Sequence, residues 1–209
     1  MVAEVLIPLP ALAPARRELI LGGQKSGKSR RAEQLAAAWL ARSADHRAVL
    51  VATATAHDDE MRERIARHRT ERAQRVPALR TVEEPSALGL AIARHSTPDT
   101  LVVVDCLTLW LTHRLMPAEA AREDAPRTSA AGGAAAAQGA DATLLAALAE
   151  APGPLVLVSN EIGLGVIPMG REVRAFVDAL GTLNRRVAQA CDRVTLMAAG
   201  LPLTLKDNT

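Results

Sequence analysis

The 209-residue sequence has few cysteines, no long apolar run and no large excess of charge of either sign. Its two cysteines, Cys106 and Cys191, lack the spacing of metal ligands, which excludes a disulfide framework and predicts a reducing compartment. We expect both thiols to be buried. Charged residues interrupt every apolar stretch before the ~18 residues that a membrane span requires. The sequence therefore predicts no membrane span.

The charge balance also limits the classes of partner. There are 25 basic and 23 acidic residues, a formal net charge of +2, so electrostatics gives no reason to expect nucleic acid as a partner. Any anion site must then be local. In the N-terminal stretch MVAEVLIPLPALAPARR the basic residues follow the apolar part, the reverse of a secretion signal. Together these features predict a cytoplasmic protein.

The length suits a single α/β domain. Short runs rich in Val, Leu and Ile predict strands buried on both faces of a mostly parallel sheet, at residues 19–21, 48–52, 101–105, 155–159 and 194–198. Helices are expected between them, from the glycine-rich loop to about residue 41, at 57–72, 85–95 and 171–190, and after residue 107. This alternation predicts a doubly wound fold, with a C-terminal hairpin turning at 199–202.

Two segments differ in composition from the rest. Residues 1–17 contain three prolines and no periodicity, and we expect them to form an N-terminal extension before a single domain at 18–206. Residues 117–140 are of low complexity and rich in alanine. Because such a segment lacks the apolar bulk to build a core, we interpret it as a surface insertion.

The stretch GGQKSGKS at 22–29 satisfies G-x-x-x-x-G-K-[ST], with a strand expected before it and a helix after it. Its glycines let the backbone wrap closely around an anion, and the helix N-terminus adds positive potential. Lys28 would reach the outer phosphates of a nucleotide, and Ser29 would ligate Mg²⁺. The alternative is a glycine-rich turn that matches by chance.

An aspartate follows the apolar run Val102–Val104. A P-loop normally needs an acidic partner at the end of a neighbouring strand, and Asp105 is the candidate. It would hold Mg²⁺ through water, or accept hydrogen bonds from a nucleotide base. The alternative is an ordinary strand-end aspartate that caps the following helix.

A highly charged helix is expected after the second strand. At a spacing of four, Arg64, His68 and Arg72 share one face, and Met61 and Ile65 form an adjacent apolar strip that can dock on the domain. This predicts His68 at the border between buried and solvated surface. Neighbouring positive charge disfavours protonation of an imidazole, which leaves a ring nitrogen free as a nucleophile. The alternative is a solvated helix whose charges serve solubility.

Other candidates are weaker. His57 lies close enough to be a reserve nucleophile. In the stretch after the fourth apolar run, Gly163 and Gly165 predict a tight bend near a ligand, and Glu161, beside Asn160, would position substrate or metal. A purely structural turn explains the same residues equally well.

The chain resembles the bifunctional adenosylcobinamide kinase and adenosylcobinamide-phosphate guanylyltransferase family of cobalamin biosynthesis. The resemblance covers nearly the whole chain apart from the N-terminal extension and the alanine-rich segment. The matching stretches are GGQKSGKSR at 22–30, VATATAHDDEMRERIARHR at 51–69, TVEEP at 81–85, VVVDCLTLWLTHRL at 102–115, VSNEIGLGVIP at 158–168 and GTLNRRVAQACDRVTLMAAGLPLTLK at 181–206.

The resemblance implies a P-loop NTPase fold, RecA-like, with a mostly parallel sheet flanked by helices. It also implies two reactions. ATP or GTP phosphorylates the hydroxyl of adenosylcobinamide, and GTP then transfers GMP through a histidine to adenosylcobinamide phosphate, giving adenosylcobinamide-GDP. The implied partners are these nucleotides and corrinoids, with Mg²⁺ as cofactor, and the implied assembly is a homotrimer.

The resemblance assigns roles to particular residues. His68 is the guanylylated histidine, Lys28 acts on the phosphates, and Ser29 and Asp105 bind the metal. The implied nucleotide contacts are Gly22, Gly23, Gln24, Lys25, Ser26, Gly27, Lys28, Ser29, Ala52, Thr53, Ala54, Arg69, Thr70, Glu71, Arg72, Glu83 and Asp105. The chain departs from the family pattern in two places. Lys25 stands where an arginine is usual, and residues 72–79 have no aromatic residue.

Two other functions fit the residues. One is a P-loop kinase for another small hydroxyl compound, without guanylyltransferase activity, in which the arginine-rich helix is a lid. The other is a non-catalytic nucleotide-binding regulator. Transfer of the GTP α-phosphate to the protein separates both from the bifunctional enzyme.

Overall fold

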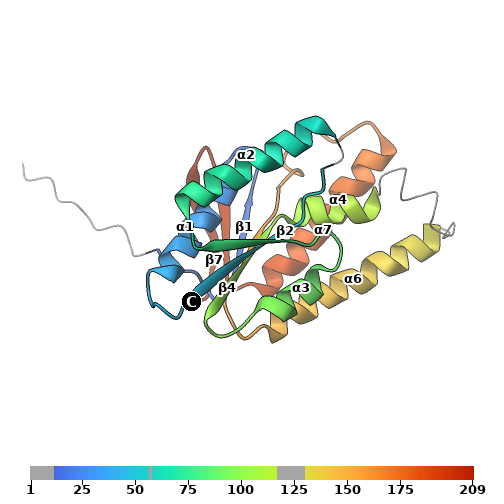
Figure 1. The fold of residues 1–209 in the computed structure, drawn as a ribbon. Coiled ribbons are helices and arrows are strands. Elements are labelled where there is room, and N and C mark those ends of the chain that lie inside the picture. The colour runs from blue at the N-terminus through green and yellow to red at the C-terminus, as the bar shows by residue number, and fades with distance from the viewer. Residues whose placement is uncertain (1–11, 57, 117–129) are drawn as a thin grey trace, which may run out of the picture.

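A seven-stranded sheet with helices on both faces forms the centre of the protein in the computed structural model, which describes residues 12–56, 58–116 and 130–209 (Figure 1). The strand order is β3-β2-β4-β5-β1-β6-β7, and only β7 is antiparallel to its neighbour. The predicted mostly parallel sheet with a C-terminal hairpin is therefore confirmed. The strands are β1 (Arg17–Gly22), β2 (Arg47–Ala52), β3 (Leu79–Glu83), β4 (Thr100–Asp105), β5 (Leu155–Val158), β6 (Arg193–Ala198) and β7 (Leu201–Asp207).

The helices divide between the two faces of the sheet. One core cluster lies between the sheet and α1, and the other lies between the sheet and α3, α4, α6 and α7. The helices are α1 (Lys28–Leu40), α2 (Asp59–Arg75), α3 (Leu88–His95), α4 (Leu107–Leu115), α6 (Ala130–Glu150) and α7 (Arg171–Ala190). Within the described ranges, no helix is both long enough and apolar enough to cross a membrane.

Strand β4 shows why the sheet strands are continuous apolar runs. Val102 and Val104 point into the core under α3, α4, α6 and α7, whereas Leu101 and Val103 point into the core under α1. Successive side chains of a strand face opposite sides, so a strand covered on both sides needs apolar residues at every position. Because β1 to β6 are parallel, their carboxyl ends meet at one edge of the sheet.

Two elements differ from the sequence-based expectations. Strand β3, with sequence LRTVE, is not among the expected strands. It is an edge strand with one buried residue, Leu79, so it lacks an apolar run. Helix α3 begins at Leu88 and not at Pro85. The carboxylate of Glu84 accepts hydrogen bonds from the amides of Ser86 and Ala87, at 2.9 and 2.8 Å, and this turn delays the helix.

The alanine-rich segment only partly falls within the described residues. Residues 117–129 lie outside them, and residues 130–140 form the first turns of α6. The same helix continues to Glu150 and buries Leu144 and Leu148 in the core. The interpretation of residues 117–140 as a surface insertion therefore missed a helix that begins within that stretch.

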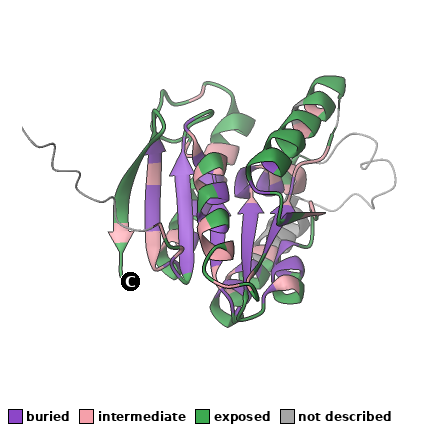
Figure 2. Ribbon diagram, turned by 60° about the vertical axis from the view of Figure 1, so that its left-hand side comes forward, coloured by how far each residue is buried: buried purple, intermediate pink, exposed green. Residues whose placement is uncertain are grey.

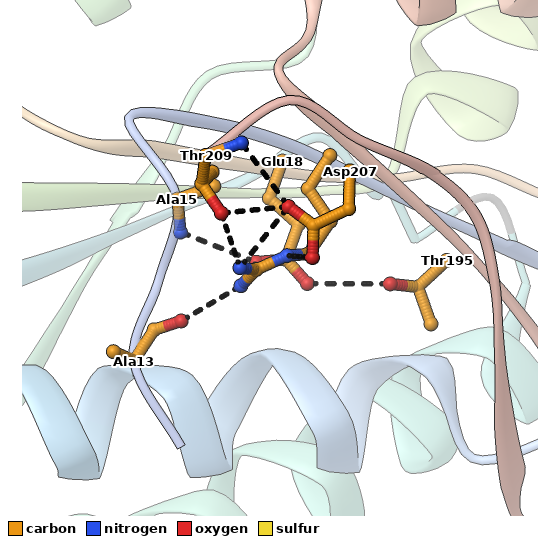
Figure 3. Close-up of polar contacts among 7 residues, drawn as sticks. Ala13, Ala15, Glu18, Thr195, Asp207 and Thr209 are labelled. Carbon is orange, nitrogen blue, oxygen red and sulfur yellow. Dashed lines mark hydrogen bonds and ion pairs between the residues drawn. The ribbon is translucent and has the colours of Figure 1, made fainter. Parts of the chain in front are cut away.

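Part of the expected N-terminal extension belongs to the folded domain. Ala15 is buried and Arg17 is the first residue of β1. The carbonyl oxygen of Ala13 accepts a hydrogen bond from Arg193 Nη1 at 3.0 Å, and the amide of Ala15 donates to Glu18 Oε2 at 3.4 Å (Figure 3). These contacts fix residues 13–18 to the amino-terminal edge of the sheet, and residues 1–11 lie outside the described residues.

Both thiols are free and buried, as predicted. Burial raises the pKa of Cys106 to about 11 and that of Cys191 to about 12. Because the thiolate is the reactive form, both side chains act as small apolar groups of the core.

Candidate functional site

The P-loop connects β1 to α1 at the carboxyl edge of the sheet. Gly22 and Gly27 have φ values of 151° and 98°, and Lys25 also has a positive φ, of 56°. A Cβ atom on Gly22 would lie 2.4 Å from the carbonyl oxygen of Met197 and 2.6 Å from Ser26 Oγ. Position 22 therefore requires glycine both for its backbone conformation and for its contacts.

Lys28 closes this loop. Its side chain is buried, with 8% exposed, and Nζ donates a hydrogen bond to the carbonyl oxygen of Gly23 at 2.6 Å. Burial lowers the pKa of Lys28, and the nearby Cys106 and Asp105 act in the opposite direction. The ammonium group is thus held inside the loop, where an anion would gain from its charge.

Two distant segments support the P-loop, and no local sequence pattern indicates either. The amide of Gly200, in the β6–β7 turn, donates to the carbonyl oxygen of Ser26 at 3.1 Å. The amide of Glu161, after β5, donates to the carbonyl oxygen of Gly22 at 3.1 Å. The buried hydroxyl of Ser26 has no partner among the described residues, so it can bond to a ligand.

Asp105 ends β4, but β4 is not adjacent to the P-loop strand. Strand β5 lies between β1 and β4, which corrects the expectation of a neighbouring strand. The N-cap position of α4 is occupied by Cys106, so Asp105, one residue earlier, does not cap this helix. Its carboxylate and the hydroxyl of Ser29 are hard oxygen donors of the kind that Mg²⁺ prefers. The donor chemistry of the two side chains therefore suits Mg²⁺.

Thr53 fixes the backbone beside Asp105. Its side chain is buried, with 1% exposed. The hydroxyl donates to the carbonyl oxygen of Cys106 at 2.7 Å and accepts from the amide of Cys106 at 2.9 Å. The amide of Thr53 donates to the carbonyl oxygen of Asp105 at 3.1 Å. Thr53 is one of the implied nucleotide contacts, but its hydroxyl bonds to the protein backbone at Cys106.

Helix α2 crosses the carboxyl edge of the sheet (Figure 1) and is exposed along most of its length (Figure 2). Asp58 caps it, accepting a hydrogen bond from the amide of Met61 at 2.7 Å. The imidazole of His68 is exposed, whereas the sequence predicted a border position. Met61 and Ile65 are half-buried, as expected. His57 and the side chain of Arg64 lie outside the described residues.

Two arginines of α2 make ion pairs with other elements, one with strand β3 and one with helix α1. Arg69 Nη1 lies 3.0 Å from Glu83 Oε1 at the end of β3, and both side chains are exposed. Arg72 is buried, with 7% exposed. Arg75 Nη1 lies 3.3 Å from Oε2 of Glu33 on α1. The structure therefore brings Arg69 and Glu83 together, two of the implied nucleotide contacts.

Two other implied contacts bond within α2 itself. The hydroxyl of Thr70 donates to the carbonyl oxygen of Ala66 at 3.1 Å. Glu71 Oε2 lies 2.8 Å from Arg75 Nη2. Both side chains are exposed, so a nucleotide would compete with these contacts for them.

The segment after β5 has a fixed stem and an apolar, exposed end. The amide of Asn160 donates to Thr108 Oγ1 at 2.8 Å, and its carbonyl oxygen accepts from Asn184 Nδ2 at 3.0 Å. Glu161 Oε1 accepts from the amide of Gly163 at 2.8 Å, which supports the structural reading of that glutamate. Apolar side chains are exposed beyond it, at Ile162, Leu164, Val166, Ile167 and Met169.

A solved structure of an ATPase domain supports the fold. It is similar to this chain with a TM-score of 0.52 at 11% identity, and the match covers 93% of this chain and 78% of that one. At that identity the similarity concerns the fold alone. It agrees with the P-loop NTPase fold expected from the sequence.

Curated relatives are much closer in sequence. The bifunctional adenosylcobalamin biosynthesis protein CobP of Pseudomonas aeruginosa is 45% identical over 191 residues, which are 91% of this chain and 97% of the relative. CobU of Salmonella typhimurium, described by the same words, is 35% identical over 190 residues, which are 90% of this chain and 98% of the relative. The family model described as cobinamide kinase / cobinamide phosphate guanyltransferase matches residues 18–205. The chain belongs to the cobinamide kinase / cobinamide phosphate guanyltransferase family.

Proposed function

We propose that this protein phosphorylates adenosylcobinamide and then transfers GMP from GTP to the product through a covalent bond to His68. Family membership over residues 18–205 supports both activities. The observation that carries the proposal is the complete P-loop, with Lys28 held inside it, at the sheet edge that α2, the helix containing His68, also crosses (Figure 1).

In the first step the substrate hydroxyl oxygen attacks the γ-phosphorus of ATP or GTP. The bond between the γ-phosphorus and the β–γ bridging oxygen breaks, a nucleoside diphosphate leaves, and the hydroxyl proton passes to solvent. Such a step needs alignment and charge neutralisation more than covalent help from the protein. The P-loop amides and Lys28 supply both. Mg²⁺, bound by Ser29 and Asp105, would neutralise further phosphate charge.

In the second step a ring nitrogen of His68 attacks the α-phosphorus of GTP. A P–N bond forms, the bond to the α–β bridging oxygen breaks, and pyrophosphate leaves. The phosphate oxygen of adenosylcobinamide phosphate then attacks the same phosphorus, which breaks the P–N bond and gives adenosylcobinamide-GDP. The covalent intermediate lets one site handle two large anions in turn. Arg69 and Arg72 would neutralise the phosphate under attack.

The exposure of His68 is compatible with this role, because the nucleophile must meet two successive ligands. His57 is the reserve nucleophile. We also propose a cytoplasmic homotrimer, which sedimentation of the purified protein would test.

The decisive experiment uses GTP radiolabelled at the α-phosphate. We expect the label to remain on the protein in an acid-labile, alkali-stable bond, and His68→Ala to abolish it. Label that persists in His68→Ala and vanishes in His57→Ala would move the site to His57. Transfer of the γ-phosphate without any α-label would identify a small-molecule kinase without guanylyltransferase activity.

A further inference from the structure

Glu33 is a buried carboxylate on the helix that begins with Lys28. It lies five positions after Lys28 on α1, and 5% of the residue is exposed. A buried carboxylate is costly unless positive groups compensate it. Arg75 Nη1, from α2, lies 3.3 Å from Glu33 Oε2. The carboxylate therefore links the P-loop helix to α2.

A second arginine of α2 acts on the same carboxylate. Burial raises the pKa of Glu33, while the charges of Arg75 and Arg72 lower it. Asp105 and Glu71 act in the same direction as burial. Both arginines thus stabilise the charged form of Glu33, and the direct contact is the one made by Arg75.

Few other contacts hold α2. Among its side chains that the structure describes, only Arg72 is buried. The ion pair between Arg69 and Glu83 is exposed on both sides, and exposed pairs contribute little to stability. Among the described residues, the ion pair between Arg75 and Glu33 is then the polar contact that joins α2 to the P-loop helix.

His68 lies one helical turn before Arg72, so the two residues share one face of α2. Arg75 follows His68 by seven residues, about two helical turns, so it lies on the same face and its ion pair with Glu33 limits the position of His68. We propose that Glu33 is a positioning residue for guanylyl transfer: its buried carboxylate pairs with Arg75, and thereby keeps the part of α2 that carries His68 in place relative to the P-loop. This inference rests on the function proposed above.

The two reactions depend on this anchor to different extents. Phosphoryl transfer uses the P-loop and Asp105, which do not need the imidazole. Guanylylation requires a ring nitrogen of His68 at the α-phosphorus, and a misplacement of about 1 Å can cost about 100-fold in rate. For Glu33→Gln we expect the rate of α-label uptake to fall by about 10- to 100-fold. Phosphoryl transfer from ATP to adenosylcobinamide should change by less than about threefold.

Glu18→Gln is the matched control. Glu18 is also a buried carboxylate near an arginine, with Arg193 Nη1 at 3.6 Å, but it lies at the opposite edge of the sheet. We expect both of its rates to stay close to those of the wild type. Glu33→Asp keeps the charge and should label faster than Glu33→Gln. If Glu33→Gln does not fold, Arg75→Gln removes the same ion pair from the other side and must give the same separation of rates.

The outcomes separate the inference from the proposed function. A wild-type protein that takes up no α-label would refute the proposed function, and the inference with it. If the wild type is labelled and Glu33→Gln is labelled equally fast, only the inference fails. A parallel loss of both rates in a folded Glu33→Gln protein would also refute it, because a general structural defect explains that result.

Discussion

The ammonium nitrogen of Lys28 lies 2.6 Å from the carbonyl oxygen of Gly23, within the loop that would hold a phosphate. A bound phosphate oxygen would replace that carbonyl as the acceptor. A charge-assisted hydrogen bond to phosphate is roughly twice as strong as a neutral one, so the exchange favours the nucleotide. The loop is thus closed on itself by the same group that would bind the ligand.

We predict that Lys28→Met lowers the rate of phosphoryl transfer by about 100-fold or more, because one preorganised positive group is lost from the transferring phosphate. Steady-state product formation with ATP measures this. The fold should survive, since methionine fills the space of the lysine stem with no charge to bury. A Lys28→Met protein that keeps most of its activity would exclude Lys28 from the reaction.

Gly22→Ala should disrupt the P-loop. The added Cβ would lie 2.4 Å from the carbonyl oxygen of Met197, and the φ of 151° is unfavourable for alanine. We expect a lower melting temperature and no measurable nucleotide binding by calorimetry. In the matched variant Gly23→Ala, the new Cβ has no heavy atom within 4 Å, so the melting temperature should stay near that of the wild type. Equal melting temperatures for the two variants would contradict the prediction.

Most of the sheet could be predicted because its strands are covered on both sides. The run at Val102–Val104 is continuous and apolar for that reason. Strand β3 could not be recognised because an edge strand with residues such as Arg80 and Glu83 has no such run. Local pattern therefore identifies central strands better than edge strands.

Long-range contacts and strand order could not be predicted. The support of the P-loop by Gly200 joins residues far apart in the chain, and nothing near either residue indicates it. The insertion of β5 between β1 and β4 changes the position of Asp105 relative to the P-loop for the same reason. The spacing of His68 predicts its helix face but not its exposure, because burial depends on what packs against that face.

Thr53→Val should destabilise the protein. Valine has nearly the shape of threonine but leaves the amide and the carbonyl oxygen of Cys106 without the partners they have at 2.9 and 2.7 Å. An unsatisfied buried polar group costs about 1–3 kcal/mol, so the free energy of unfolding should fall by at least that amount in urea titrations. Phosphoryl transfer should also slow, because Asp105 precedes Cys106. Thr53→Ser keeps the hydroxyl and should lose much less stability. Equal losses in the two variants would show that the methyl group, and not the hydroxyl, matters.

Glu18 should make stability depend on pH in an unusual direction. The residue is fully buried, and burial raises its pKa above the usual 4.5, with the Ala15 amide and Arg193 opposing the shift. In the unfolded chain the pKa returns to 4.5. Between these two values the native state keeps a proton that the unfolded state has lost, so the Glu18 contribution to stability falls as pH rises through that window and is constant above it.

Replacing the carboxyl group tests this directly, because Glu18→Gln cannot titrate at position 18. Glu33, whose pKa is also raised by burial, titrates in both proteins and cancels from the difference. The free energy of unfolding of the wild type minus that of Glu18→Gln should be most positive at and below pH 4.5 and should decrease as the pH rises from there to neutrality. Urea unfolding across that range measures it. A difference that increases with pH would mean that the ion pair with Arg193 outweighs burial, and that the native state holds Glu18 charged.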